Sequence, residues 1–275
     1  VMKLIGDPET RYREDPVRML RAVRLAAKLR FTIDPESAER IPELASLLQE
    51  ASSARLFEET LKLFLSGHAE ASFLGLEAHG LLAGLLPETA AALASNRSGA
   101  LRRMLLEGLR ATDARIAADE PVSPAFLFAL LLWPAYCRTL AMLQAQGMHV
   151  AEAERRAADR VTLHQVATVA LPRRFSLPMQ EVWLLQARFS QRQRKRVVRL
   201  LSHPRFRAAY DFLLLRQSAS DSHAEDIAFW AEAQRDPDHA LEVAALTVES
   251  EGDGASTESR GPRRRRRRRP AAVGH

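Results

Sequence analysis

A short stretch near the start of the chain combines carboxylates and guanidinium groups at helical spacing. Glu14 and Asp15 stand directly before a proline, and Arg18, Arg21 and Arg24 follow at intervals of three residues. Residues three apart share one side of an α-helix, so the three guanidinium groups line that side with a slow drift. An aspartate acceptor and an arginine donor one turn apart can bind the edge of a nucleobase, which presents donors and acceptors in one plane.

A simpler interpretation fits the same spacing. Asp15 is expected to cap a helix whose first turn contains Pro16, and it can pair with Arg18 on the helix surface. The two interpretations are compatible, because a capping carboxylate keeps a free lone pair. Arg11 and Arg13 are expected to contact phosphate. Arg21 is expected to contact the base or the triphosphate, or to support Asp15. Glu14 is expected to orient the arginines.

The composition favours helices over sheets. Hydrophobic residues make up 47% of the 275 residues and aromatic residues only 6%, while alanine and leucine dominate. Proline, glycine and capping residues predict helices. A first helix is expected to start at Asp15, and others over residues 35–50, 54–65 with Ser53 as its cap, 68–79, 100–118, 124–146 with a break at Pro134, 150–169, 179–188 and 204–215. A further helix is expected to follow Ser190 and to carry Val197, Val198, Leu200 and Leu201 on its apolar side. A linker bracketed by Pro172 and Pro178 and a capping box from Ser190 to Gln193 are expected between the later helices.

Several classes of site and location receive no support from the residues. The single cysteine, Cys137, permits no internal disulfide, which favours a reducing cytoplasm. The longest apolar run, residues 125–135, is shorter than the roughly 20 residues of a membrane span, so no membrane association is expected. The histidines lack metal-ligand spacing, and no metal site is predicted.

The basic residues are concentrated in two blocks. Eight of the 40 lysines and arginines lie in the tail, at Arg260 and in the run 263–269, and the remaining 32 are balanced by 34 acids. A second block runs from residue 173 to 207, with ten basic residues and one acid, Glu181. Cationic tracks with aromatic side chains bind single-stranded RNA. The expected RNA contacts are Arg24, Arg192, Arg194, Lys195, Arg196, Arg199, Arg205, Arg207 and Tyr210, whereas a solvated charged face is the alternative for the run 192–199.

The run from Leu4 to Leu29 resembles the bacterial poly(A) polymerase I family, which belongs with the CCA-adding tRNA nucleotidyltransferases. The segment Glu14-Asp15-Pro16-Val17-Arg18 matches the family's Glu-Asp-x-x-Arg motif, which reads the base of the incoming nucleotide. The resemblance continues through residues 54–59, 124–129 and 203–211 and ends in the arginine-rich tail. It implies an all-α array of neck, body and leg helices, with a disordered basic C-terminal tail.

The family's catalytic head carries a Gly-Gly turn and an Asp-x-Asp pair for Mg²⁺, and neither is found near the motif. The only Asp-x-Asp spacing, residues 236–238, is interpreted as a turn or helix start. The chain is therefore expected to be a C-terminal part of the enzyme that adds no nucleotides by itself. The expected organisation is a remnant of the link to the head at 1–13, neck helices with the nucleotide and RNA sites at 14–66, body helices at 67–120, an RNA-binding helical region at 121–248 and the tail at 249–275.

Three functions follow from these observations. The first is transfer of AMP from ATP to RNA 3′ ends, with Mg²⁺ bound by the head and with polyadenylation promoting RNA decay. The second is a CCA-adding enzyme acting on tRNA, which the motif alone cannot separate from the first. The third is a non-catalytic RNA-binding adaptor. An RNA helicase or an RNA-decay protein is expected to dock on the basic tail.

Overall fold

The computed structural model describes residues 1–219 and 223–237, and this part of the chain is all-α, as predicted. The tail that was expected to be disordered lies outside the described residues. The first helices are α1 (Pro8–Glu14), α2 (Val17–Leu29), α3 (Pro35–Leu44), the 3₁₀ turn η1 (Ala45–Glu50), α4 (Ser53–Phe64), α5 (Ala69–Ala78), α6 (Leu82–Leu85), α7 (Pro87–Ser95) and α8 (Ala100–Ala117). They are followed by α9 (Pro124–Leu131), α10 (Trp133–Ala145), α11 (Val150–Thr168), α12 (Arg173–Leu185), η2 (Gln186–Arg188), α13 (Arg194–Leu201), α14 (Phe206–Gln217) and α15 (Ala224–Arg235).

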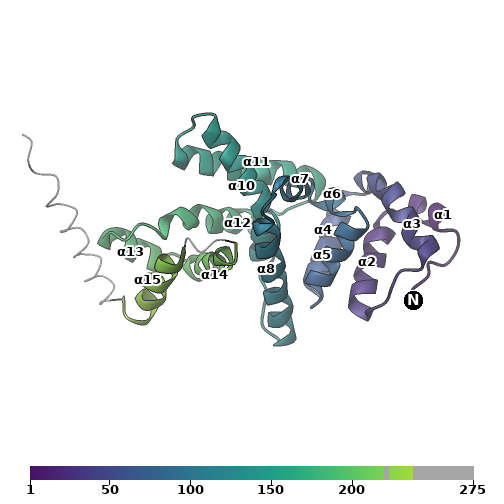
Figure 1. Ribbon diagram of the computed structural model, residues 1–275, viewed down its shortest axis with the longest axis horizontal. Coiled ribbons are helices and arrows are strands. Elements are labelled where there is room, and N and C mark those ends of the chain that lie inside the picture. Colours follow the sequence, from purple (N-terminus) through teal and green to yellow (C-terminus); the bar gives the residue numbers. More distant parts are fainter. Residues whose placement is uncertain (220–222, 238–275) are drawn as a thin grey trace, which may run out of the picture.

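The helices form an elongated array rather than a ball (Figure 1). Helices α1, α2 and α3 occupy one end, α4, α5 and α8 stand in the middle, and α13 and α15 occupy the other end, to which α12 and α14 lead from the middle. The α10–α11 hairpin projects from the middle on one side. The two charged regions that the sequence singles out, at the start of α2 and along α13, therefore lie at opposite ends of the molecule.

Capping and proline chemistry start the first helices. Asp7 caps α1 by accepting the backbone N–H of Thr10 at 2.8 Å, and Pro8 occupies the first turn. Met2 forms backbone hydrogen bonds with Thr32 and Asp34, which joins the start of the chain to the turn after α2. This pairing fixes the segment that leads into α1 beside the far end of α2.

A buried aromatic group holds the middle of the molecule together. Trp183 of α12 donates its ring N–H to the carbonyl of Ala129 in α9 at 3.0 Å and stacks on Tyr136 of α10. Burial raises the pKa of Tyr136, so this phenol stays protonated. The predicted break before Pro134 is confirmed, since α9 and α10 meet at 52°. Within the described residues no single helix is long and apolar enough to cross a membrane, and α9 and α10 meet that test only as this bent pair.

The buried apolar side chains form two clusters. The larger runs from Tyr12 in α1 to Trp183 in α12 and takes in Phe212 of α14. The smaller is built by η2 and helices α13 to α15 around Phe189 and Trp230, with Leu185 from the end of α12. Helices α12 and α14 contribute to both clusters, so they connect the end that carries α13 to the rest of the chain.

Three local expectations are wrong. Pro178 lies inside α12 rather than at the edge of a linker, because Met179, Val182 and Trp183 of the same helix are buried against the core. The capping box does not form, since Ser190 donates to the carbonyl of Ala187 and not to the start of α13.

The third correction concerns α4. Ser52 caps this helix and Ser53, the expected cap, is its first residue. Sequence cannot separate two adjacent serines, since either hydroxyl suits the N-cap.

Close packing of α2 on α5 depends on Gly75. A Cβ atom at Gly75 would stand 2.7 Å from Cγ1 of Val23. We predict that Gly75→Ala lowers the free energy of unfolding by about 1 kcal/mol, because overpacking outweighs the gain in helix propensity. In a chain that already carries Val23→Ala, which removes the opposing methyl groups, the same change should be neutral or stabilising. Urea denaturation of the four proteins measures both effects, and equal costs of Gly75→Ala in the two backgrounds would contradict the packing argument.

Candidate functional site

The Asp15 carboxylate lies between α1 and α2 and is held from three sides. Its Oδ1 atom accepts the backbone N–H of Val17 at 3.2 Å and Nη2 of Arg55 at 2.8 Å. Its Oδ2 atom lies 3.7 Å from Nη1 of Arg21, and 17% of the side chain is exposed. Asp15 therefore accepts the first backbone amide of α2, but the predicted cap is wrong in its position, because Pro16 rather than Asp15 is the N-cap residue. The carboxylate is fixed in place and still reaches solvent.

Arg18 is positioned by a different set of groups. Its Nη1 atom donates to the carboxylate of Glu14 at 3.1 Å and to the carbonyl of Arg11 at 3.3 Å. Arg11 donates to the same Glu14 oxygen at 2.6 Å. Glu14 thus orients two arginines, which agrees with its expected role. The surface pair between Asp15 and Arg18 that the simpler interpretation required is not formed, so both side chains retain hydrogen-bonding capacity.

These contacts define an Asp15 cluster, which consists of Asp15, Glu14, Arg11, Arg18, Arg21 and Arg55. Four guanidinium groups face two carboxylates, so the cluster carries excess positive charge. An oriented carboxylate beside exposed guanidinium groups suits a ligand that has both a polar ring edge and phosphates.

Arg55 is the member of the cluster that the sequence did not assign to the site. It lies 40 residues after Asp15 and comes from α4. A signal was present, since Arg55 falls in the segment 54–59 that carries part of the resemblance, but nothing in the spacing indicates its partner.

Two arginines of the same segment as Asp15 have other partners. Arg13 pairs with Glu9 one turn earlier in α1, at 2.9 Å. Arg24, an expected RNA contact, donates to Glu59 of α4 at 2.5 Å, and the Glu59 side chain is only 2% exposed. Arg24 therefore neutralises a buried carboxylate, and its guanidinium joins α2 to α4.

Tyr12 anchors the cluster to the core. Tyr12 stands between Arg11 and Arg13 in the sequence, and its ring is fully buried in the core. Burial raises the pKa of its hydroxyl. Pro8 and Tyr12, four residues apart, form the buried side of α1, and the charged residues of the helix lie on its other sides.

The magnesium site that the family resemblance implies does not fit the residues described here. Within residues 1–219 and 223–237, no three histidine, cysteine, aspartate or glutamate side chains gather as metal ligands. The Asp15 and Glu14 carboxylates are each bound by arginines. The chemistry of this cluster is therefore hydrogen bonding and charge attraction.

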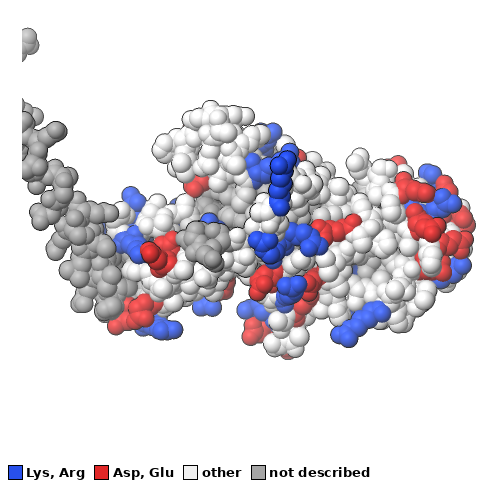
Figure 2. All heavy atoms as spheres, in the orientation of Figure 1, with Lys and Arg blue, Asp and Glu red and all other residues white. Residues whose placement is uncertain are grey.

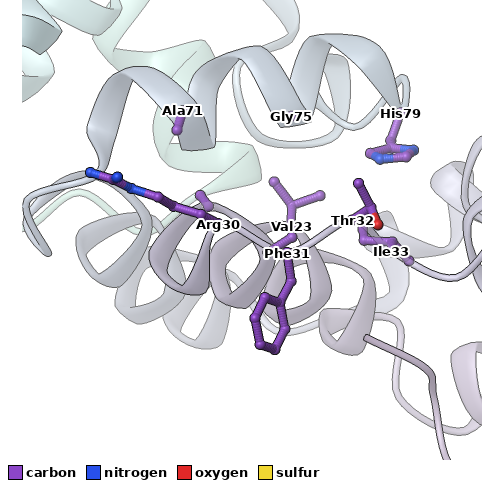
Figure 3. Close-up of a pocket in the computed structure, with 10 residues that line it drawn as sticks. Val23, Arg30, Phe31, Thr32, Ile33, Ala71, Gly75 and His79 are labelled. Carbon is purple, nitrogen blue, oxygen red and sulfur yellow. The ribbon is translucent and has the colours of Figure 1, made fainter. Parts of the chain in front are cut away.

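A separate hollow lies between the second half of α2 and α5 (Figure 3). Arg30 extends toward one end of it, the His79 ring lies at the other, and Val23 and Gly75 line its middle. No residue of the Asp15 cluster lines this hollow, and at 100° per residue Val23 projects from a different side of α2 than Arg18. The hollow is therefore not an extension of the Asp15 cluster.

The expected RNA contacts near α13 separate into free and paired residues. Arg192 pairs with Asp226 at 3.0 Å, Arg205 with Glu181 at 3.2 Å and Arg207 with Asp211 at 3.0 Å. Four further cations are exposed and make no ion pair within the described part of the chain. We call these the α13 cations: Arg194, Lys195, Arg196 and Arg199.

Tyr210, the expected stacking residue, belongs to the smaller core cluster. It is 6% exposed, and its hydroxyl donates to the carbonyl of Ile227. A ring that is packed on both sides has no free face for a base, so its burial gives the stacking prediction no support. Phe206, which is 7% exposed, belongs to the same cluster.

Basic residues over α8 stand out on the face drawn in Figure 2, and two of them are compensated by acids of α5. Arg102 pairs with Glu77 at 2.6 Å and Arg110 with Glu70 at 2.6 Å, both across the contact with α5. These ion pairs bind two helices together. The α13 cations are thus the more available surface for a polyanion.

Two family models match the chain. One, described as "Polymerase A arginine-rich C-terminus", matches residues 146–270, and the other, described as "Probable RNA and SrmB- binding site of polymerase A", matches residues 30–93. The first contains the α13 cations, and the second contains Arg55 and Glu59 together with most residues around the hollow of Figure 3.

Curated proteins of two kinds, poly(A) polymerases and CCA-adding enzymes, are similar to the chain. The chain is 40% identical over 277 residues to Poly(A) polymerase I of Salmonella typhi, covering 99% of this chain and 59% of the relative. It is 45% identical over 217 residues to Poly(A) polymerase I of Escherichia coli O157:H7, covering 78% of this chain and 47% of the relative. A CCA-adding enzyme of Levilactobacillus brevis is 44% identical over 68 residues, which cover 25% of this chain and 17% of that enzyme. The chain thus spans about half to three fifths of the length of these polymerases.

The buried Arg24–Glu59 pair makes a testable contribution to stability. We predict that Arg24→Ala lowers the free energy of unfolding by about 3 kcal/mol, because Glu59 is left without its nearest partner in a buried position. Lys62→Ala removes the second cation near Glu59, at 3.7 Å, but this lysine is 56% exposed and should cost less than about 1 kcal/mol. Chemical denaturation compares the two, and equal losses would show that the buried pair carries no special weight.

Proposed function

The chain belongs to the poly(A) polymerase family, and we propose that it supplies the nucleotide-selecting and RNA-holding surfaces of a polynucleotide adenylyltransferase. Such an enzyme transfers AMP from ATP to RNA 3′ ends and thereby promotes RNA decay in the cytoplasm. The observation that carries the proposal is the Asp15 cluster, in which an oriented carboxylate and an oriented guanidinium stand side by side without pairing.

The chemistry of the adenine edge suits this arrangement. Adenine presents an amino donor beside a ring-nitrogen acceptor. The amino group can donate to the Asp15 carboxylate, and the ring nitrogen can accept from the Arg18 guanidinium. Guanine presents a carbonyl where adenine has its amino group, so its oxygen would face a carboxylate. Each well-formed bidentate contact of this kind is worth roughly 1–3 kcal/mol of discrimination. Arg11 and Arg21 are placed to meet the triphosphate, and Arg55 holds Asp15 in position.

We predict that Asp15→Asn combined with Arg18→Gln relaxes nucleotide selection in the complete polymerase. The ratio of ATP to GTP incorporation at a primer 3′ end should fall by at least about tenfold, since one directed contact is worth that much. Arg40→Gln, which removes an exposed ion pair of α3 with Glu43, is the matched control. Incorporation from each nucleoside triphosphate in turn gives the ratio, and an unchanged preference for ATP would remove the basis of the proposal.

A second candidate is CCA addition to tRNA. Cytosine presents the same sequence of amino donor and ring acceptor as adenine, so one carboxylate and one guanidinium can read both bases. The local identity with a CCA-adding enzyme favours this candidate over a limited stretch. Incubation of the complete enzyme with CTP or ATP and a tRNA that lacks its 3′ end separates the two functions. Incorporation of CTP would assign the chain to CCA addition.

RNA is proposed to bind along α13, where the four α13 cations make no ion pair within the described residues. Replacing Arg194, Lys195, Arg196 and Arg199 by glutamine should weaken binding of single-stranded RNA. It should also reduce the slope of log affinity against log salt by up to about 0.7 for each phosphate that is no longer bound. Glutamine at Arg40, Arg115, Arg138 and Arg156, all exposed and ion-paired, gives a control of equal charge. Fluorescence anisotropy across a salt series measures both, and equal slopes for the two variants would place the RNA surface elsewhere.

A non-catalytic adaptor is the third candidate and keeps the same RNA surface. Its partner, an RNA helicase or RNA-decay protein, is proposed to bind the basic tail, which lies outside the described residues. The family-model description that names SrmB for residues 30–93 points to a second place for a protein contact. Phe31, which is 49% exposed, lines the hollow of Figure 3 in that region.

A further inference from the structure

Beside the α13 cations lies a cleft of about 490 Å³ between α13, α14 and α15. Val198 and Leu201 form its α13 wall, Phe206 and Arg207 contribute from α14, and Gln234 contributes from α15. Val198 is apolar and yet 46% exposed. The cleft thus offers an apolar surface next to a strongly basic one.

Helical periodicity places two cations at the mouth of this cleft. Arg194 and Lys195 precede Val198 by four and three residues, which puts them one turn away on the same side of α13. A nucleic-acid backbone bound by these side chains would run past the cleft opening. Its bases would then lie within reach of the interior.

Arg207 provides a flat surface in the cleft wall. Its guanidinium is bound by Asp211 through two contacts, Nε to Oδ2 at 3.2 Å and Nη2 to Oδ1 at 3.0 Å. The group also lies 6.0 Å from the centre of the Tyr210 ring, and 73% of the side chain is exposed. A guanidinium fixed by a bidentate carboxylate and still open to solvent can stack on the face of a nucleobase.

The polar groups of the cleft leave little for reading a sequence. The Gln234 amide donates to the carbonyl of Trp230 at 2.9 Å, and its oxygen accepts from Arg207 at 3.4 Å. Ser202, the other polar residue of the lining, donates its hydroxyl to the carbonyl of Val198 at 2.9 Å. The remaining lining residues are apolar or cationic. Every base has a π-face that can stack on such a surface, whereas an acidic protein segment would find no free donor deep in the cleft.

We propose that the cleft between α13, α14 and α15 binds one unpaired base of single-stranded RNA, stacked on the guanidinium of Arg207, with the adjoining phosphates on Arg194 and Lys195. The proposal rests on RNA binding by the α13 cations and adds a base-dependent, sequence-tolerant subsite to it. Duplex RNA, whose bases are already stacked, would not use the cleft.

The first experiment needs no variant of the protein. A fluorescent single-stranded RNA is compared with an oligomer of the same phosphate count in which the bases are replaced by abasic spacers. We expect binding of the abasic oligomer to be weaker by at least about tenfold, the scale of one stacked base. The salt slope should be nearly the same for both, because the phosphates are unchanged. Equal affinity for the two oligomers would overturn the proposal.

The second experiment uses Arg207→Lys, which keeps the charge and removes the planar group. Affinity for the base-containing RNA should fall about fivefold at an unchanged salt slope, and affinity for the abasic oligomer should not change. Arg235→Lys is the matched control, since Arg235 is exposed and pairs only with Glu232 in the described structure. Circular dichroism shows whether each variant is folded.

The outcomes separate this proposal from the one on which it rests. In one outcome, the α13 glutamine variant binds RNA more weakly with a reduced salt slope, as expected, while Arg207→Lys binds RNA as well as the unaltered protein. That result would overturn the base subsite alone. Loss of polyglutamate binding in Arg207→Lys, with RNA binding intact, would assign the cleft to an acidic protein and would also overturn the proposal. If neither the α13 glutamine variant nor Arg207→Lys changed RNA binding, both the RNA surface on α13 and the base subsite would be overturned.

Discussion

A carboxylate that cannot be left uncompensated in the interior determines how the first helices meet. Glu59 of α4 is almost completely buried, and Arg24 of α2 is the group that neutralises it. An ion in the interior is costly unless it is paired, so the register of α2 against α4 is closely constrained. That register brings Arg55, one turn before Glu59, to the carboxylate of Asp15 at the other end of α2. The geometry of the Asp15 cluster is thus a consequence of a contact between two residues that lie outside the cluster.

Hydrogen bonds within the protein hold the side chains of the Asp15 cluster in place. Asp15 accepts from a backbone amide and from Arg55, while Glu14 fixes Arg18 and Arg11 independently. The two groups that are proposed to read the base therefore lose little conformational freedom when the base binds. A pair formed directly between Asp15 and Arg18 would have had to break first.

Sequence alone predicted the helices well, because their starts and ends depend on local chemistry. Proline, glycine and capping residues act within a few positions, and the boundaries of α5, α8 and α11 lie within a residue or so of the expected ones. Pro178 is the informative failure, since a helix continued through a residue that normally ends one. The burial of Trp183 and its neighbours on α9 compensates for the missing backbone hydrogen bond, and such compensation depends on packing partners far away in the chain.

The site was predicted in its local part and missed in its distant part. Asp15, Glu14 and Arg18 lie within one turn of each other, so their spacing was informative, whereas Arg55 and Glu59 are distant in sequence. The basic residues around α13 could likewise be identified from the sequence, but the sequence did not show which of them form ion pairs. Asp226, Glu181 and Asp211, which select the neutralised members, stand on other helices or another turn.

The two hydrophobic clusters give the molecule a modular construction. Only α12 and α14 contribute to both, so the end that carries α13 and α15 has its own interior around Phe189 and Trp230. Substitutions that change the packing of one cluster therefore have little effect on the packing of the other. Over evolutionary time, the helices that carry the α13 cations can therefore be rebuilt while the Asp15 cluster at the opposite end keeps its geometry.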